Sequence, residues 1–266
     1  MFNTYVINLE RDKEKYRIIS EHLAKNNIKH IRFNAIDGKK KLSPELYQHV
    51  SQNCLEYCPF SVIGCGLSHI MVAKLFYNSD PNPYCLILED DAKPLTKNTI
   101  VHIKELVKKA PVDWDIIRLY CQGFCNYDNN FKGYNLKKNN VLMGSNCAYL
   151  LSKKGAMKII SMKLNWHIDS QLSNNKNILS FSTTYPLFIP KSNISTSYIN
   201  NNKYLSKLLD IKIGKYDNSI DWYLGNSVFR EPGTKKVYNY YQIIGLIIVV
   251  TIIFILAMLL FLRINK

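Results

Sequence analysis

Three consecutive carboxylates, the acidic triplet Glu89, Asp90 and Asp91, follow the apolar run YCLIL at residues 84–88. Such a run is typical of a central strand covered on both faces, and unpaired charge at its end is costly to bury. In an extended chain Glu89 and Asp91 point to one side and Asp90 to the other, so Glu89 and Asp91 could share one Mg²⁺ or Mn²⁺ ion. That ion could bridge the phosphates of a nucleoside diphosphate and neutralise charge as the group leaves. The alternative is a solvated acidic turn.

Strand-like and helix-like segments alternate on both sides of the triplet. The predicted strands cover residues 4–9, 30–35, 84–88, 115–120 and 146–151. The predicted helices cover residues 10–26, 70–77, 100–109 and 153–162. This alternation predicts an α/β fold. Residues 39–60 are polar, and we expect irregular structure there. Ligands of open α/β sheets bind outside the carboxyl ends of strands, which is where the triplet falls.

The segment GCGLSH at residues 64–69 places a histidine beside two glycines. The glycines predict a turn, and Ser68 could cap the helix that follows. His69 would then stand at a helix start, from which it could reach a substrate. A buried structural histidine is the alternative.

Residues 243–262, IIGLIIVVTIIFILAMLLFL, carry no charge and are long enough to cross the hydrocarbon core of a bilayer. We expect a C-terminal, single-pass transmembrane helix there. We expect the rest of the chain to form a catalytic domain (1–228), a linker (229–242) and a short tail (263–266). The stretch after Pro190 is rich in Asn, Ser, Lys and Tyr and is typical of surface loop.

The start of the chain, MFNTYVINLERDK, lacks the apolar stretch of an export signal, so we expect insertion after translation. Arg230, Lys235 and Lys236 precede the predicted span. The positive-inside rule therefore predicts that the large domain is cytosolic.

The formal net charge of +15 indicates an anionic partner, such as a phosphate-bearing ligand, an acidic lipid surface or nucleic acid. Patterns typical of nucleic-acid binding are missing, so we expect no such partner. Glycine-rich dinucleotide loops, Walker lysine loops and GxSxG elbows are also missing, which argues against dehydrogenases, P-loop enzymes and serine hydrolases. Seven cysteines without an export signal indicate reduced thiols, and the spacings Cys54/Cys58 and Cys121/Cys125 are not those usual for structural zinc.

Several segments recur in a characteristic order: YVINLERDKEKYR at 5–17, AIDG at 35–38, GCGLSH at 64–69, LILEDD at 86–91 and WDIIRL at 114–119. Later segments are SNCAYLLSKKGAMKII at 145–160, HID at 167–169 and YPLFIPKSNIS at 185–195. Together they resemble glycosyltransferase family 25, which includes lipooligosaccharide and collagen galactosyltransferases. The joint pattern is far more specific than any single motif.

The resemblance implies a GT-A-like fold that binds a nucleotide-sugar donor, with a divalent metal, Mn²⁺ or Mg²⁺, and transfers the sugar with inversion. It assigns the acidic triplet to donor and metal binding, which agrees with the metal pair Glu89 and Asp91 expected from strand alternation. It places the donor nucleotide near Asn8, Arg11 and Asp37, at the ends of the first two strands.

Inversion needs a base that takes the proton of the acceptor hydroxyl. Asp169, in a predicted loop, is the leading candidate, with Asp91 or Glu89 behind it; His69 could also reach the donor or acceptor. Asp169 could equally bind the metal or cap the next helix.

The expected reaction moves a hexose, galactose or glucose, from a UDP-sugar to a hydroxyl of a glycan, glycolipid or protein. The predicted membrane helix favours acceptors close to a bilayer. The alternative function is a catalytically silent, membrane-anchored adaptor with the same fold.

Overall fold

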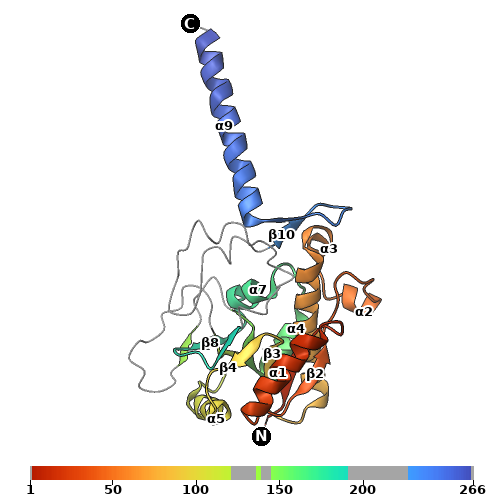
Figure 1. Ribbon diagram of the computed structural model, residues 1–266, viewed down its shortest axis with the longest axis vertical. Coiled ribbons are helices and arrows are strands. Elements are labelled where there is room, and N and C mark those ends of the chain that lie inside the picture. Colours follow the sequence, from red (N-terminus) through yellow and green to blue (C-terminus); the bar gives the residue numbers. More distant parts are fainter. Residues whose placement is uncertain (1, 121–135, 139–144, 191–226, 265–266) are drawn as a thin grey trace. The chain divides into compact units, whose positions relative to one another are not determined.

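The computed structural model describes residues 2–120, 136–138, 145–190 and 227–264 (Figure 1). The chain forms two compact units: Met1–Leu55 with Phe60–Ser195, and Glu56–Pro59 with Thr196–Lys266. The predicted surface loop at 191–226 and the pair Cys121/Cys125 lie outside the described residues. The candidate site belongs to the first unit.

The first unit is built around a seven-stranded sheet. In spatial order its strands are β2 (Ile31–Asn34), β1 (Thr4–Asn8), β3 (Tyr84–Glu89), β7 (Ala148–Ser152), β5 (Ile116–Arg118), β8 (Ser180–Thr183) and β6 (Leu136–Lys138). β1 pairs in parallel with β2 and β3, and β5 with β8, whereas β7 and β6 run antiparallel to their neighbours. The predicted α/β fold is therefore confirmed as a mixed α/β sheet rich in parallel pairs.

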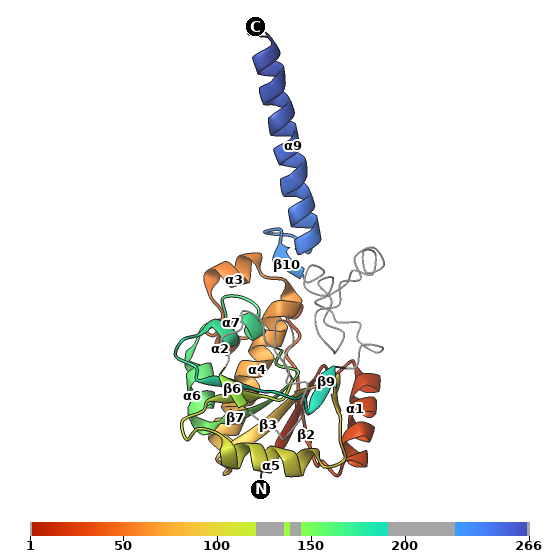
Figure 2. The ribbon, with the colours of Figure 1, turned by 90° about the vertical axis from the view of Figure 1, so that its left-hand side faces the viewer.

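Helices accompany the sheet (Figures 1 and 2). They are α1 (Lys13–Lys25), α2 (Pro44–Tyr47), α3 (Gln52–Tyr57), α4 (Phe60–Ser79), α5 (Thr99–Lys109), α6 (Lys153–Ser161) and α7 (Ile168–Asn174). A two-stranded antiparallel sheet joins β4 (Ala92–Pro94) to β9 (Phe188–Pro190). Residues 39–60 are not wholly irregular as expected, because Ser43 caps α2 and Pro44 occupies its first turn.

The central strand β3 is buried on both faces, as its apolar run predicts. Leu86 and Leu88 pack in one cluster with Leu23 of α1 and Leu106 of α5. Alternation along the strand turns Ile87 to the opposite face, where it is also fully buried. Burial on both faces fixes the register of β3, and with it the place where the acidic triplet leaves the sheet.

Helix α4 corrects the prediction of a glycine turn at residues 64–69. A Cβ on Gly64 would lie 2.6 Å from Ile36 O, and one on Gly66 would lie 2.5 Å from the side chain of Leu164. The glycines thus allow close packing inside a helix that starts at Phe60. Ser68 is not a cap, because its buried hydroxyl donates to Gly64 O at 2.7 Å and accepts from Ile36 N at 2.8 Å.

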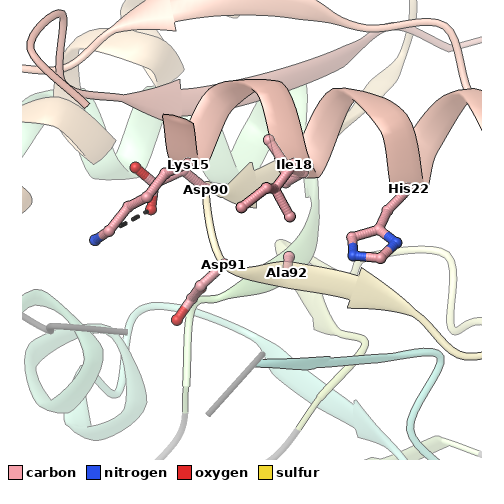
Figure 3. Close-up of a pocket in the computed structure, with 7 residues that line it drawn as sticks. Lys15, Ile18, His22, Asp90, Asp91 and Ala92 are labelled. Atoms are coloured by element: carbon pink, nitrogen blue, oxygen red, sulfur yellow. Dashed lines mark ion pairs between the residues drawn. The ribbon is translucent and has the colours of Figure 1, made fainter. Parts of the chain in front are cut away.

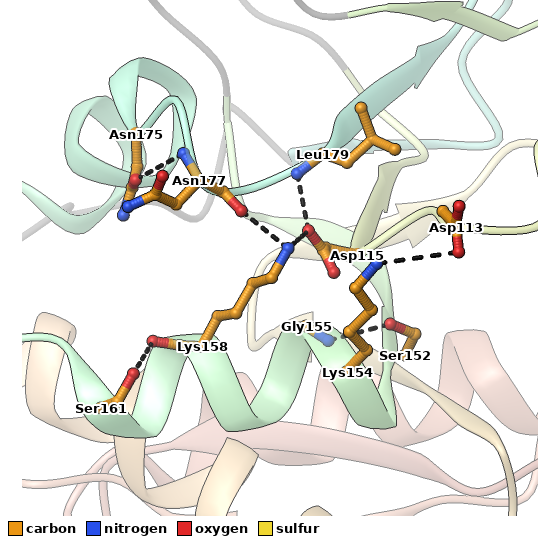
Figure 4. A network of polar contacts seen from close by, with 10 residues as sticks. All are labelled: Asp113, Asp115, Ser152, Lys154, Gly155, Lys158, Ser161, Asn175, Asn177 and Leu179. Atoms are coloured by element: carbon orange, nitrogen blue, oxygen red, sulfur yellow. Dashed lines mark hydrogen bonds and ion pairs between the residues drawn. The ribbon is translucent and has the colours of Figure 1, made fainter.

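A buried aspartate fixes α6 to the far half of the sheet (Figure 4). Asp115, fully buried just before β5, accepts from Leu179 N at 2.7 Å and from the amino group of Lys158. Lys158 also donates to Asn177 O at 2.7 Å. These bonds tie α6 to the starts of β5, which ends at Arg118, and β8, whose Ser180 accepts a hydrogen bond from Arg118.

The second unit contains a hairpin and a long apolar helix. Strands β10 (Ser227–Arg230) and β11 (Val237–Asn239) pair antiparallel, and Gly233 in their turn has a φ of 73°. Most of the hairpin thus falls in the predicted linker at 229–242, although β10 begins two residues before it, at Ser227. Asn239 N donates to Gln242 Oε1 at 3.0 Å and Gln242 N donates to Asn239 Oδ1 at 2.9 Å, a capping box that starts α9 (Tyr240–Ile264) directly after β11.

Two helices in the described part of the chain are long and apolar enough to cross a membrane. One is α4, which is largely buried inside the first unit. The other is the segment Tyr240–Met258 of α9, none of which is buried, and it contains most of the predicted span.

Candidate active site

The candidate residues gather at one edge of the sheet, where β1, β3 and β5 end and β7 begins. β1 and β3 are parallel, so Asn8 and Glu89 finish at the same edge. β7 runs the opposite way, so the residues just before it reach this edge too, and Glu89 N donates to Cys147 O at 2.8 Å. Arg118 ends β5 there. The fold thus joins residues from distant parts of the sequence.

Asp90 is held on the side of helix α1. It accepts from Asn8 Nδ2 at 2.7 Å, and its Oδ1 lies 4.0 Å from the amino group of Lys15. Asn8 Oδ1 in turn accepts from Arg32 at 2.6 Å. Figure 3 shows Asp90 beside α1 and Asp91 pointing away from it, as expected for neighbours in the triplet.

Burial and repulsion within the acidic triplet disfavour the ionised forms of Glu89 and Asp91. Burial, and then repulsion from Asp90, raises the pKa of Glu89 to about 7. Burial, and then repulsion from Glu89, raises the pKa of Asp91 to about 8. Asp91 Oδ1 is buried without a hydrogen-bond partner among the described residues. A hard divalent cation fits this donor set, because it would replace repulsion with attraction and coordinate the free oxygen.

His69 lies in the middle of α4 and not at a helix start, which corrects the prediction. Its ring is fully buried, with Nδ1 3.0 Å from the hydroxyl of Tyr149 and Nε2 3.2 Å from Glu89 Oε1. Burial lowers the pKa of His69 to about 4, so the ring is neutral at physiological pH. Both ring nitrogens are engaged, so His69 holds Glu89 in place.

Asp169 lies in the first turn of α7, where the sequence predicted a loop. Burial, and then the charge of Glu89, raises its pKa to about 7. Asp169 Oδ1 is buried with no hydrogen-bond partner among the described residues. A carboxylate of this kind, close to the acidic triplet, can exchange a proton near neutral pH.

A cleft of about 510 Å³ opens beyond the ends of β1 and β2. Its polar lining includes Arg11, Asp37, Lys40 and Lys41. Arg11 pairs with Asp37, and although burial acts to raise the pKa of Asp37, hydrogen bonds from Lys39 N and Arg11 hold it below its usual value. The structure thus brings Arg11 and Asp37 together at the cleft, while Asn8 lies at the end of β1 and contacts Asp90.

The model of glycosyltransferase family 25, described as an LPS biosynthesis protein family, matches residues 1–178. The chain belongs to glycosyltransferase family 25. The matched region contains the acidic triplet, His69 and Asp169, together with the end of β1. This family 25 chain is therefore a glycosyltransferase.

Two glycosyltransferases are among the solved structures to which the chain is similar. One acts in glycosylation of the major capsid of PBCV-1, with 9% identity and a TM-score of 0.32, covering 66% of this chain and 67% of the other. The second is a Drosophila β1,4-galactosyltransferase 7 variant with manganese, UDP-Gal and xylobiose, with 11% identity and a TM-score of 0.35, covering 80% and 81%. Among curated proteins, none matches the family 25 chain.

The sequence did not single out Arg118 and Asn146 in this family 25 site. Both are fully buried; Arg118 Nε donates to Asn146 Oδ1 at 3.2 Å, and its Nη1 donates to Ser180. Arg118 Nη2 and Asn146 Nδ2 have no hydrogen-bond partner in the described structure. Burial lowers the pKa of Arg118 to about 10, while the nearby Asp169 opposes that shift. An arginine ending an apolar strand run was the available signal.

Proposed function

We propose that the chain transfers a hexose from a UDP-sugar to an acceptor hydroxyl, with Mn²⁺ or Mg²⁺ and with inversion at the sugar carbon. One observation carries the proposal, the order of groups along the sheet edge. The basic cleft lies beyond β2 and β1, the acidic triplet follows β3, and Arg118 ends β5. In that order, the cleft would hold the nucleotide, the triplet and its metal would hold the diphosphate, and the transferred sugar would lie toward Arg118.

The cleft has the size and charge that a nucleoside diphosphate needs. Its volume falls within the range of small-molecule sites, about 300–1,000 Å³. Arg11, Lys40 and Lys41 offer cationic donors to phosphate oxygens, and Asp37 can accept from a ribose hydroxyl. We assign the donor nucleotide to this cleft.

Glu89 and Asp91 would hold the metal, which when bound supplies positive charge to the departing diphosphate. Asn8 and Lys15 fix Asp90, so the triplet stays in place whether or not donor is present. His69 orients Glu89 through its Nε2 contact. These contacts organise the site before the donor binds, which lowers the cost of ordering it.

Asp169 is our candidate for the base that takes the proton of the acceptor hydroxyl. Its pKa of about 7 suits proton transfer near neutral pH. Asp91 and Glu89 are less suited because the metal would occupy them. His69 is less suited because both of its ring nitrogens are already hydrogen-bonded.

Helix α9 would anchor the enzyme in a membrane, with its large domain in the cytosol. The exposed apolar side chains of α9 support this assignment, since they cannot remain in water without partners. An anchored enzyme meets acceptors at the bilayer surface more often than free ones. The acceptor would be a glycan, glycolipid or protein hydroxyl near that surface.

The test uses the full chain in detergent, incubated with UDP-galactose or UDP-glucose, a mixture of hydroxyl acceptors and Mn²⁺. Release of UDP is measured with and without chelator. Asp91→Asn should abolish release, while Asp113→Asn, whose carboxylate is on the surface, should leave it unchanged. Folded protein that neither binds nor turns over any UDP-hexose would overturn the proposal and leave the adaptor function.

A further inference from the structure

We propose that the chain has a second metal site, for Zn²⁺ or a similar thiophilic divalent cation, formed by Cys65, His69 and Glu89. One ligand atom from each residue lies within 4.8 Å of those of the other two. Thiolate, imidazole and carboxylate are the three ligand types that zinc uses in proteins. The site lies beside the oxygen-only donor set of the acidic triplet and shares Glu89 with it.

The separation of two of the ligand atoms already fits a tetrahedral ion. Cys65 and His69 are four residues apart on α4, which places them on the same face of the helix. His69 Nε2 lies 3.2 Å from Glu89 Oε1. Two ligands about 2.0 Å from zinc at tetrahedral angles are about 3.3 Å apart, so these atoms already have the required separation.

Tyr149 supplies the outer contact that a metal-binding histidine usually has. Its hydroxyl lies 3.0 Å from His69 Nδ1 and can accept the proton of that nitrogen. In this tautomer Nε2 carries no proton, so its hydrogen bond to Glu89 in the metal-free chain gives way to coordination when the ion binds. Because Tyr149 is fully buried in β7, it fixes the orientation of the ring before any ion binds.

The charges of the site balance when the ion binds. Burial, and then the carboxylate of Glu89, raises the pKa of the Cys65 thiol well above its usual value, so coordination must release the thiol proton to solvent. One thiolate and one carboxylate then neutralise a divalent cation, which removes the cost of burying isolated charge. Glu89 is 31% exposed, so water can occupy the fourth position.

Sharing Glu89 makes the two sites compete. Zinc favours sulfur and nitrogen ligands, whereas Mn²⁺ and Mg²⁺ favour oxygen. Zinc bound to Cys65 and His69 would withdraw Glu89 from the donor metal, so zinc should inhibit transfer. The inhibition rests on the proposed function, but the binding does not.

Cobalt provides a readout that is independent of activity. Co²⁺ titrated into the full chain in detergent should give a near-ultraviolet thiolate-to-cobalt charge-transfer band that added Zn²⁺ removes. Cys65→Ser should lose this band, whereas Cys54→Ser, a buried cysteine of α3, should keep it. A band that persists in Cys65→Ser, or no band in the unsubstituted chain, would overturn the proposal.

The variant Tyr149→Phe tests whether the outer contact to His69 contributes to metal binding. It keeps all three ligands but removes the outer contact, so Co²⁺ affinity should fall about 10- to 100-fold. Unchanged affinity would contradict the site as described.

A second experiment measures activity. It compares the zinc concentration that halves UDP release, which should be higher in Cys65→Ser than in the unsubstituted chain. A cobalt band without UDP release would refute only the proposed function, whereas UDP release without the band would refute only the zinc site.

Discussion

The side-chain amide of Asn8 donates to Asp90 Oδ2 at 2.7 Å, which links the ends of β1 and β3. The same amide also donates to Asp12 O at 3.1 Å and accepts from Arg32 at 2.6 Å. Asn8 is almost fully buried. This single residue therefore sets the position of Asp90 and separates its charge from that of Arg32.

Asn8→Ala should destabilise the first unit. It removes the hydrogen bond that Asp90 Oδ2 accepts and the one that Arg32 donates to Asn8, and a buried polar group that loses its partner atom costs about 1–3 kcal/mol. Urea unfolding followed by tryptophan fluorescence would measure the loss. Asn98→Ala is the matched control, because Asn98 is exposed and its side chain makes no capping bond to α5. Equal stability of the two variants would contradict the role of Asn8.

Metal removal should make stability depend on pH. The folded-state pKa values of Glu89 and Asp91 are raised to about 7 and about 8 from 4.5 and 3.8. A carboxyl group with a raised folded-state pKa contributes stability below its ordinary pKa, and that contribution is lost as pH rises through the folded value. The chelated chain should therefore lose thermal stability between about pH 4 and about pH 8.

Mn²⁺ should raise the melting temperature more at pH 8 than at pH 5, because the ionised carboxylates bind it. Scanning calorimetry of the full chain with chelator or Mn²⁺ provides the comparison. Asp91→Asn should weaken both the pH dependence and the Mn²⁺ effect. An unaltered Mn²⁺ effect in that variant would remove Asp91 from the metal site.

Asp169→Asn should reduce kcat by about 10²- to 10⁴-fold, the usual contribution of a general base. Donor binding should not change, because the cleft near Arg11 is lined by other residues. Steady-state kinetics with varied donor and acceptor would separate the two effects. Asp113→Asn, an exposed carboxylate, is the control. A purely structural Asp169 would instead lower protein stability with little effect on kcat in the folded fraction.

Gly38→Ala should disturb the contact between the loop after β2 and helix α4. A Cβ at Gly38 would lie 1.8 Å from Phe60 O and 2.8 Å from Gly64 N, distances that force the backbone apart. Overpacking of this kind costs about 1–3 kcal/mol. Gly245→Ala in α9 has no atom within 4 Å of the new Cβ and should be neutral. Comparable thermal stability of the two variants would disprove the close approach.

The strands β1, β3, β5 and β7 could be predicted from the sequence because each contains an apolar run, and the acidic triplet stood out because it ends such a run. The strands β6 (LKK) and β8 (SFST) lack such a run and were not predicted. The glycines of α4 were misread, because Ile36 and Leu164, which require them, are distant in sequence. A turn glycine and a packing glycine look alike until the tertiary neighbours are known. The placement of His69 at a helix start failed for the same reason.

The partners of the site depend on strand order, which no local pattern reveals. Tyr149 reaches His69 only because β7 inserts beside β3, antiparallel to it. Arg118 reaches Asn146 because β5 lies on the other side of β7. Asp169 was assigned from the family resemblance, while its helix α7 is too short to give a periodic signal.

The hairpin before α9 restricts where the chain can be cut to release a soluble enzyme. The ring of Phe229 stacks on Tyr57 at 5.9 Å, and Arg230 Nε donates to Cys58 O at 3.1 Å. Tyr57 and Cys58 are separated by one residue, Pro59, from Phe60, the first residue of α4. Truncation before Ser227 would remove Phe229 and Arg230. Tyr57 and Cys58 would then lose these contacts just before the helix that carries His69. Truncation after Asn239 removes the apolar helix and keeps the hairpin.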